Sequence, residues 1–270
     1  MKTSFHFLLV IVILFFSSCD LFRDITNPDP DPATGCVLVE TNLTIPNDPA
    51  HELTEYKYNA SGSLIEVIKK AWDMDPDPYI DRTTISYNGV KVNQIKTYFT
   101  FLSDPEEAHA VYTFFFEGDL VDSVRITSGE PYNQNGYMLT EYTGDKLSKL
   151  IGYNFNTVTS AYYENGTTSI DWTGDNITKT TTTNINSPQN SIIEYEYDDK
   201  KTPLNNLGLA VSSNVLTMLS SNNVISRKNL AADGTVFSTT ETSYTYNDTN
   251  YPITSTWGGG YPTNYVYDCN

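Results

Sequence analysis

Aromatic residues recur in closely spaced pairs along the chain, and a turn follows each pair. Tyr56 and Tyr58 precede Asn59-Ala60-Ser61-Gly62, and the apolar run 64–68 comes next. Side chains two apart in a strand share a face, so each pair gives that face a large apolar area. Asn-Gly and Asp-Gly steps supply the positive φ angles that tight hairpins need. The pattern predicts a β-hairpin.

The same pattern repeats through the rest of the chain. The further anchors and their turns are Tyr87 before Asn88-Gly89, Phe114 and Phe116 before Glu117-Gly118-Asp119, Tyr142 before Thr143-Gly144-Asp145, Tyr163 before Asn165-Gly166, Tyr195 and Tyr197 before Asp198-Asp199, and Tyr244 and Tyr246 before Asn247-Asp248. The spacing suits one hairpin plus a connection, and its drift indicates degenerate repeats. We predict an all-β, antiparallel up-and-down meander of hairpins that forms a closed or strongly curved soluble barrel.

Two segments interrupt this pattern. Residues 103–108 carry a cap, a proline and two acids, which is typical of a short helical turn. In the second segment, Leu204, Leu207, Val211 and Val215 fall at helical spacing after Pro203. The sequence predicts a short helical or loop insertion near residues 202–222 that plugs or covers the sheet.

The N-terminus is a targeting segment. Lys2 supplies a positive charge, Phe7 to Phe16 form a short apolar run, and Ser17-Ser18 precede Cys19. This resembles a bacterial lipobox, which implies cleavage before Cys19 and attachment of diacylglycerol and palmitate to it. The alternative is an ordinary secretory signal with a chance cysteine. The predicted organisation is a signal peptide over 1–18, a Pro/Asp-rich tether over 19–35 and one all-β domain over 36–270.

Cys36 and Cys269 bracket this predicted domain. An exported chain enters an oxidising compartment, where two thiols usually pair. We predict a disulfide that places the first strand beside the last one, which closes the sheet and removes its exposed edges. The alternative is two unrelated buried thiols.

Composition narrows the class of protein. The chain has 270 residues, 20 of them Tyr, and a formal net charge of −17 with 16 Lys and Arg. Tyrosine favours strands, and the acidic balance argues against nucleic-acid binding. A membrane-inserted barrel is the rival fold. It needs an apolar lipid-facing band, whereas alternate positions such as Glu55/Lys57 and Glu194/Glu196 are charged.

These residues carry a family resemblance. The recurring Tyr-x-Tyr-turn-Leu/Val pattern resembles a degenerate tyrosine-aspartate (RHS-type) repeat, or YD repeat. The segment Tyr195–Leu204, with Asn222-Asn223-Val224 and the terminal Tyr-x-Tyr-x-Cys, resembles uncharacterised Bacteroidota lipoproteins with a porin-like β-barrel domain of unknown function. The resemblance implies a fold and an envelope location. It implies no activity and no functional residues.

Candidate chemistry is sparse. His51 and His109 have no metal-ligand neighbours at a recognisable spacing, and no catalytic motif is present. Asp73, Asp75 and Asp77 stand at alternate positions, as in an oxygen cage for Ca²⁺, but the turn glycine and closing glutamate of an EF-hand are missing. The alternative is an acidic, proline-stiffened loop.

The segment Trp257-Gly258-Gly259-Gly260-Tyr261 is the best ligand-binding candidate. Its glycines allow close backbone approach, and Trp257 and Tyr261 can stack on sugar rings. The alternative is a flexible hairpin loop with a packed tryptophan. No cofactor is expected apart from that weak calcium motif.

We expect a lipid-anchored, outer-membrane protein of the cell envelope that faces either the periplasm or the surface. The leading hypothesis is a non-enzymatic module that binds a glycan, a peptide or an envelope protein. The alternatives are a polysaccharide-acting hydrolase with paired carboxylates and a structural subunit of an envelope complex.

Overall fold

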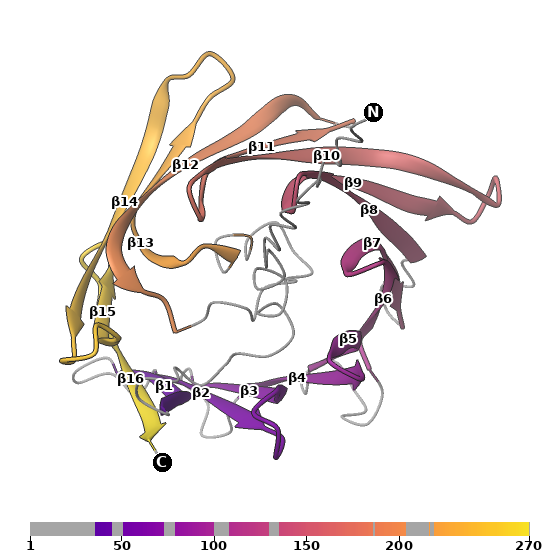
Figure 1. The fold of residues 1–270 in the computed structure, drawn as a ribbon. Helices are drawn as coiled ribbons and strands as arrows, with labels where there is room; N and C mark the ends of the chain where they lie inside the picture. Colours follow the sequence, from indigo (N-terminus) through magenta and orange to yellow (C-terminus); the bar gives the residue numbers. More distant parts are fainter. Residues whose placement is uncertain are drawn as a thin grey trace, which may run out of the picture.

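The protein forms a closed barrel of sixteen antiparallel strands (Figure 1). The computed structural model describes residues 36–44, 51–72, 79–99, 108–129, 135–185, 187–203, 216 and 219–269. The strands are β1 (Cys36–Thr44), β2 (His51–Tyr58), β3 (Leu64–Trp72), β4 (Tyr79–Asn88), β5 (Lys91–Phe99), β6 (Ala110–Glu117), β7 (Leu120–Ser128), β8 (Asn135–Thr143), β9 (Lys146–Asn156), β10 (Ala161–Thr173), β11 (Asn176–Asn184), β12 (Ser187–Lys201), β13 (Asn222–Leu230), β14 (Val236–Tyr246), β15 (Pro252–Trp257) and β16 (Pro262–Cys269).

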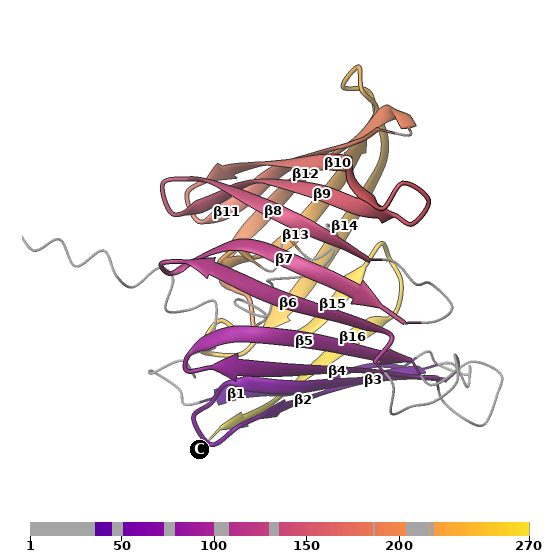
Figure 2. The ribbon, with the colours of Figure 1, turned by 90° about the vertical axis from the view of Figure 1, so that its right-hand side faces the viewer.

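Each strand pairs with its sequence neighbours, and β1 pairs with β16, so the predicted up-and-down meander is confirmed. Within the described ranges, no helix is long and apolar enough to cross a bilayer. Because successive strands run in opposite directions, their connections fall at two ends of the barrel (Figure 2). The disulfide end holds Cys36, Cys269 and the connections from each even strand to the next odd one. The distal end holds the connections from odd strands to even ones.

The predicted Cys36–Cys269 disulfide is confirmed. The two cysteines are register partners on β1 and β16, and a bond joins residues separated by 233 positions in sequence. The bond fastens the seam at which the first and last strands meet. A closed sheet leaves neither strand with an unpaired edge.

The inner face of the barrel is the packed one. Two clusters of buried side chains cover neighbouring strands. The first contains Val92, Ile95, Phe114, Val121 and Val124, and the second contains Leu147, Ile170, Ile177, Tyr195 and Leu216. Tyrosine rings join both clusters from β4, β6, β8 and β12. The predicted aromatic face is therefore the one that lines the interior of the barrel.

An eightfold repeat of paired residues runs around this inner face near the disulfide end. We name it the inner belt. Its register pairs are Tyr267 with Leu38, Tyr58 with Leu64, Tyr87 with Val92, Phe116 with Val121, Tyr142 with Leu147, Trp172 with Ile177, Tyr197 with Val224, and Tyr246 with Pro252. Each pair lies beside a β-bulge. Bulges bend and twist strands, so this repeat curves the sheet at regular intervals.

Hydrogen bonds link one unit of the belt to the next. The Tyr58 hydroxyl donates to the Leu38 carbonyl at 2.8 Å, and the Tyr87 hydroxyl donates to the Leu64 carbonyl at 2.7 Å. Further bonds of this kind run from Trp172 to Leu147, Tyr197 to Ile177, Tyr244 to Val224 and Tyr267 to Pro252. A bulge disrupts the strand ladder, and these side-chain donors satisfy the carbonyl oxygens beside it.

The outer face carries charges on alternate positions. Lys57 lies between the inward-facing Tyr56 and Tyr58, and its ammonium group is 2.6 Å from Glu66. Other ion pairs on this face are Arg82–Glu66, Lys70–Glu55, Lys149–Glu141, Lys179–Glu194 and Lys228–Glu196. The predicted charged outer face is thus present on β2 to β4, on β8 to β9 and on β11 to β13.

The described part of the predicted insertion near 202–222 contacts the inner face of the barrel. Most of it, residues 204–215 and 217–218, lies outside the described residues. Leu216 is 2% exposed and packs in the second cluster. Ser220 is fully buried, and its hydroxyl accepts a hydrogen bond from the Ile177 backbone N–H at 3.0 Å. This part of the insertion therefore covers the inner face at a bulge of the belt. The predicted helical turn over 103–108 falls largely outside the described residues.

Two predicted turns are wrong. The turn predicted at Asp198-Asp199 lies inside β12, which continues to Lys201. Asn165-Gly166 was expected to form a turn after Tyr163, but Tyr163 and Gly166 both lie inside β10, and the turn comes at Gly174-Asp175. A Cβ on Gly166 would collide with the Thr183 carbonyl oxygen of β11. This glycine serves close strand contact instead of a turn, and the aromatic anchor of this unit is Trp172.

Candidate functional site

The Trp257–Tyr261 hairpin connects β15 and β16 at the distal end. Trp257 is 63% exposed and Tyr261 is 48% exposed. Gly258 and Gly259 have φ values of 59° and 74°, a left-handed conformation that glycine adopts without strain. The Gly258 N–H donates to the Glu241 carbonyl at 2.7 Å, which ties the hairpin to β14. The alternative of a packed tryptophan does not hold, since the indole is largely open to solvent.

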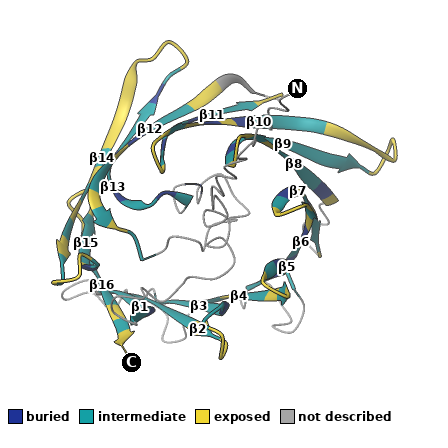
Figure 3. Ribbon diagram, viewed as in Figure 1, coloured by how far each residue is buried: buried dark blue, intermediate teal, exposed yellow. Residues whose placement is uncertain are grey.

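Exposed aromatic and aliphatic side chains lie along the distal end of the barrel. Nine of the thirteen large apolar side chains that are exposed lie there: Tyr79, Val158, Tyr162, Tyr163, Ile185, Val236, Phe237, Trp257 and Tyr261. We call this set the distal rim. Figure 3 shows exposed positions on the projecting β9–β10 and β13–β14 hairpins. The exposed aromatic rings of this set present faces that a ligand can stack on.

Behind the rim, the inner face of β10 to β14 is rich in hydroxyl and amide groups. Thr168 and Thr182 share a hydrogen bond of 3.0 Å, and the Asn229 amide donates to the Ser238 hydroxyl at 2.8 Å. These are the groups that recognise the hydroxyls of a polar, uncharged ligand. The distal part of the barrel thus combines aromatic faces with hydrogen-bonding groups.

A pair of carboxylates lies on the inner face at the opposite side of the barrel. The carboxylate of Glu52 is 2.7 Å from the Lys69 ammonium group, and Lys69 is the register partner of Asp81. Burial raises the pKa of the Asp81 carboxyl; Lys69 opposes the rise and Glu52 adds to it. A raised carboxyl pKa is a property of general acids, so this pair is the nearest match to the predicted hydrolase alternative.

His109 lies next to an aromatic ring at the distal end. His109 packs edge-on against Phe99, with ring centroids 4.7 Å apart. Its backbone N–H donates to the Thr97 carbonyl at 2.7 Å, and its carbonyl accepts from Gly129. This packing gives His109 a structural role at the distal edge of β5. The side chain of His51 lies outside the described residues.

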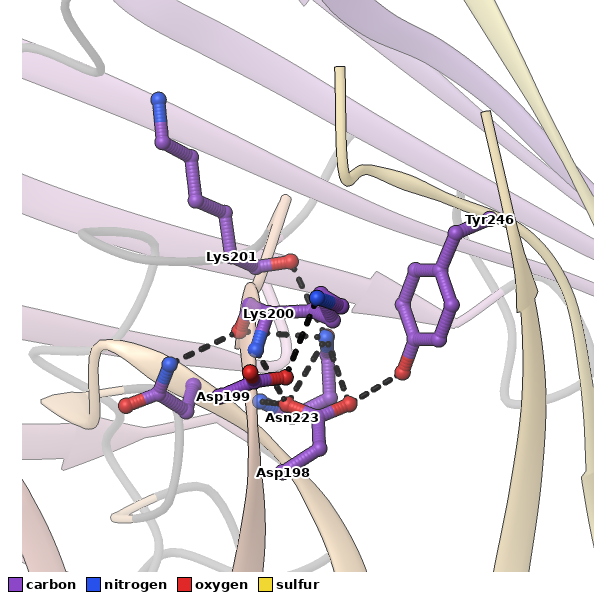
Figure 4. Close-up of polar contacts among 7 residues, drawn as sticks. Asp198, Asp199, Lys200, Lys201, Asn223 and Tyr246 are labelled. Carbon is purple, nitrogen blue, oxygen red and sulfur yellow. Dashed lines mark hydrogen bonds and ion pairs between the residues drawn. The ribbon is translucent and has the colours of Figure 1, made fainter. Parts of the chain in front are cut away.

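The segment that carries the family resemblance forms a polar network at the disulfide end (Figure 4). One Asp198 carboxylate oxygen accepts from the backbone N–H of Lys200 at 2.9 Å and of Asn223 at 3.2 Å. The other accepts from the Asn223 amide at 3.3 Å and from the Tyr246 hydroxyl. Burial, followed by this bond to Asp198, raises the pKa of Tyr246.

This network joins three strands. Asp198 belongs to β12, Asn223 to β13 and Tyr246 to β14, and the Asn223 amide also donates to the Lys201 carbonyl at 3.0 Å. The carboxylate is occupied by donors from the chain itself, which fits a structural role. The most family-like residues therefore fasten β13 to the barrel on either side of the insertion.

One residue that sequence reasoning missed is Arg227 on β13. It faces inward between Tyr195 on β12 and Thr240 on β14. Its Nε atom is buried and has no hydrogen-bond partner. No motif surrounds it, and its inward orientation follows from a bulge between Tyr197 and Glu196 that the sequence does not reveal.

The remaining predicted site residues lie outside the described residues. These are the lipidation residue Cys19 and the calcium candidates Asp73, Asp75 and Asp77. Among the residues that the structure describes, no group of three or more His, Cys, Asp or Glu side chains is placed to hold a metal ion. Lipidation and calcium binding remain predictions.

Comparison with solved structures gives the class of fold. A porin-like protein from Bacteroides uniformis matches with a TM-score of 0.56 at 13% identity, over 86% of this chain and 96% of that one. A porin-like protein from Bacteroides vulgatus matches at 12% identity over 86% and 98% of the two chains, with a TM-score of 0.38. The B. uniformis protein shares the porin-like barrel fold with this chain.

No family model and no curated protein matches the chain. The predicted resemblance to porin-like barrels is confirmed for the fold. Membership of a lipoprotein family and the tyrosine-aspartate repeat remain predictions.

Proposed function

We propose that this protein is a lipid-anchored, non-enzymatic barrel of the bacterial outer membrane that binds a glycan at its distal rim. The observation that carries the proposal is the distribution of exposed aromatic side chains. They gather at the end of the barrel that lies opposite Cys36 and Cys269.

The position of the predicted anchor supports this orientation. The tether over residues 19–35 leads from Cys19 to the start of β1 at the disulfide end. A Pro-rich tether is extended by roughly 3 Å per residue and acts as a semi-rigid spacer. A lipid on Cys19 therefore holds the disulfide end toward the membrane and leaves the distal rim free to meet a ligand.

The outer face supports a barrel that stands in water instead of lipid. A charge on the lipid-facing side of a membrane barrel costs about 2–4 kcal/mol near the bilayer midplane. Lys57, Glu66 and Arg82 occupy outer positions on three successive strands, and Glu66 pairs with both cations. The porin-like fold of the B. uniformis protein is thus combined here with an outer face suited to water.

The chemistry of the distal end favours a glycan as the ligand. Sugar rings present apolar faces that stack on aromatic rings and hydroxyls that need hydrogen-bond partners. Trp257 and Tyr261 offer exposed aromatic faces, and the Thr, Ser and Asn side chains behind them offer polar partners. An apolar protein partner would need a broader continuous patch than single side chains spaced around a rim.

Lipidation and binding need separate tests. Metabolic labelling with an alkyne-bearing palmitate analogue is expected to mark the wild-type protein and to leave the Cys19→Ala variant unmarked and released from membranes. Labelling of the variant at the wild-type level would refute the anchor.

For binding, the full chain is screened against an array of bacterial and host oligosaccharides. Trp257→Ala is expected to lower affinity for bound glycans at least tenfold, a cost of about 1.4 kcal/mol. The matched control is Val266→Ala, which removes an exposed side chain from the outer face of β16. A wild-type protein that binds no glycan, or a Trp257→Ala variant that binds as wild type, would refute glycan binding at the rim.

The carboxylate pair Glu52 and Asp81 supports a second candidate function, polysaccharide hydrolysis. Asp81, with its raised pKa, would act as the general acid, and Glu52 would act as base or nucleophile. Release of reducing ends from a panel of polysaccharides tests it. Activity that persists in Asp81→Asn would exclude this pair.

A further inference from the structure

Arg227 stands out among the cations of the described residues. Most of the others form ion pairs with carboxylates, including Lys228, the next residue on β13. Arg227 makes no ion pair or hydrogen bond with any described side chain, and its Nε is the one buried side-chain nitrogen or oxygen without a hydrogen-bond partner among these residues. Its side chain as a whole is half-buried, so part of it stays open to the interior.

Glutamates on the two strands beside β13 point to the other face of the sheet and have partners there. Glu241 on β14 accepts from the Ser226 hydroxyl at 3.0 Å, and Glu196 on β12 pairs with Lys228. Ser226 and Lys228 flank Arg227 in sequence, and their side chains point outward. Among the residues that the structure describes, this inward-facing guanidinium therefore has no carboxylate partner. The buried Nε is out of reach of a ligand, so a ligand would meet the part of the Arg227 side chain that stays open to the interior.

The distal rim is close to this arginine. Thr240 on β14 is the register partner of Arg227, and on its other side it borders the Trp257 hairpin. The Thr240 methyl group is 3.5 Å from the position of a Cβ on Gly258. One strand thus separates β13 from the hairpin, and two strand spacings amount to about 10 Å. Trp257 pairs with Thr242, two residues along β14 from Thr240, and so lies on the inner side as Arg227 does.

We propose that Arg227 binds the carboxylate of an acidic sugar in the glycan that stacks on Trp257. A guanidinium matches a carboxylate through two parallel N–H···O bonds, which a neutral sugar cannot form. The proposal rests on the proposed glycan-binding function and deepens it. The strongly negative net charge limits the ligand to a short oligosaccharide with few acidic groups, because a long polyanion is repelled.

The test uses the full chain and matched oligosaccharides. The probes are uronate-terminated trisaccharides of glucuronate and galacturonate, their methyl esters and the same trisaccharides with a phosphorylated terminal sugar. The methyl ester keeps the ring and removes the charge. Titration calorimetry is expected to show at least tenfold tighter binding of a uronate probe than of its ester by the wild-type protein.

The variants separate the contribution of Arg227 to affinity from that of Trp257. Arg227→Gln is expected to reduce the ratio of acid to ester affinity to near one, and Arg227→Lys to keep part of it. Trp257→Ala is expected to weaken acid and ester alike. The control is Arg125→Gln, which removes an outward-facing arginine on β7 and should change neither affinity. Thermal unfolding of each variant confirms that it folds.

The outcomes distinguish the two proposals. Wild-type preference for the acid that persists in Arg227→Gln refutes the role of Arg227 and leaves glycan binding standing. Equal binding of acid and ester by the wild type refutes the acidic ligand and also leaves glycan binding standing. A preference for the phosphorylated probes over the uronates overturns the carboxylate and assigns the arginine to a phosphate. Binding of none of the probes, together with an empty glycan array, refutes both proposals.

Discussion

The two ends of the barrel are built from the same repeated hairpin but with opposite surfaces. At the disulfide end, aromatic rings point inward and their polar atoms are bonded to the chain, as with Tyr58 and Leu38. At the distal end, rings such as Trp257 and Phe237 are exposed. One residue type therefore serves two purposes in this barrel. Where aromatic donors are satisfied they hold the strands together, and where rings are exposed they are available to a ligand.

The Asp198 and Arg227 side chains show the same contrast within two neighbouring strands. Asp198 receives donors from three residues and fastens β13 near the disulfide end. Arg227 lies three residues before Leu230 at the end of β13, and its buried Nε lacks such partners. Satisfied polar groups stabilise a fold, whereas an unsatisfied buried group costs free energy.

Alkaline pH should destabilise the disulfide end as a whole. Burial raises the pKa of Tyr56 and of Tyr87 to about 12, and it raises the pKa of the inward-facing Tyr58 and Tyr197 as well. The folded chain therefore holds these protons more tightly than the unfolded chain, in which the pKa is about 10. The stabilisation is complete below pH ~10 and is lost as pH rises through about 12. Urea midpoints between pH 8 and 12 measure it, and a midpoint that stays level above pH 10 would contradict it.

Removing the disulfide should have the next largest effect. The Cys36→Ser/Cys269→Ser double variant frees a loop of 233 residues in sequence and should lose about 3–5 kcal/mol of unfolding free energy. Urea unfolding measures the loss. The reduced wild-type protein serves as the control and should unfold at the same midpoint as the double variant. A variant as stable as the oxidised wild type would show that the strand pairing alone holds the seam.

Asp198→Ala should cost about 2–4 kcal/mol, because it leaves the Asn223 amide and the Tyr246 hydroxyl without their acceptor. Asp199→Ala is the matched control. The Asp199 side chain is 86% exposed, so its removal should change stability by less than about 0.5 kcal/mol. Equal stabilities of the two variants would disprove the structural role of this network.

Tyr87→Phe tests one link of the inner belt. The variant keeps the ring and loses the hydrogen bond to the Leu64 carbonyl, which should cost about 1 kcal/mol. Tyr153→Phe is the control, since this outward ring stacks on Tyr137 with centroids 4.5 Å apart and keeps that stacking. Denaturant midpoints compare the two. No loss in Tyr87→Phe would mean that the belt acts through packing alone.

Phe237→Ser should have the smallest effect. Phe237 is 70% exposed on the distal rim, and its removal should change the unfolding free energy by no more than about 0.5 kcal/mol. The far-UV circular dichroism melt of the variant checks this. A loss above 1 kcal/mol would show that the rim contributes to the fold and would weaken the division between the two ends.

The sequence predicted the parts of the fold that depend on local pattern. The pair Tyr56 and Tyr58 followed by Asn59–Gly62 is a hairpin because side-chain alternation and turn chemistry act over a few residues. The same reasoning failed at Gly166, where a glycine inside β10 makes room for the backbone of β11. A glycine that serves a turn and one that serves strand contact look alike in sequence.

The candidate site was predicted only in part. Trp257 and Tyr261 were chosen for their glycine neighbours, and both are exposed in the structure. Arg227 was missed because the bulges of the belt shift which residues of a strand face inward. After each bulge, alternation starts again with the opposite phase, so counting by twos from the turn gives the wrong face.

By itself, the sequence determined the hairpins, the aromatic inner face and the covalent link between the first and last strands, because these follow from alternation, turn residues and thiol chemistry. Only the tertiary structure decided that sixteen strands close, that the exposed rings collect at one end and that Arg227 meets the Trp257 hairpin across Thr240. These depend on strand pairing between residues far apart in the chain, which no local pattern encodes.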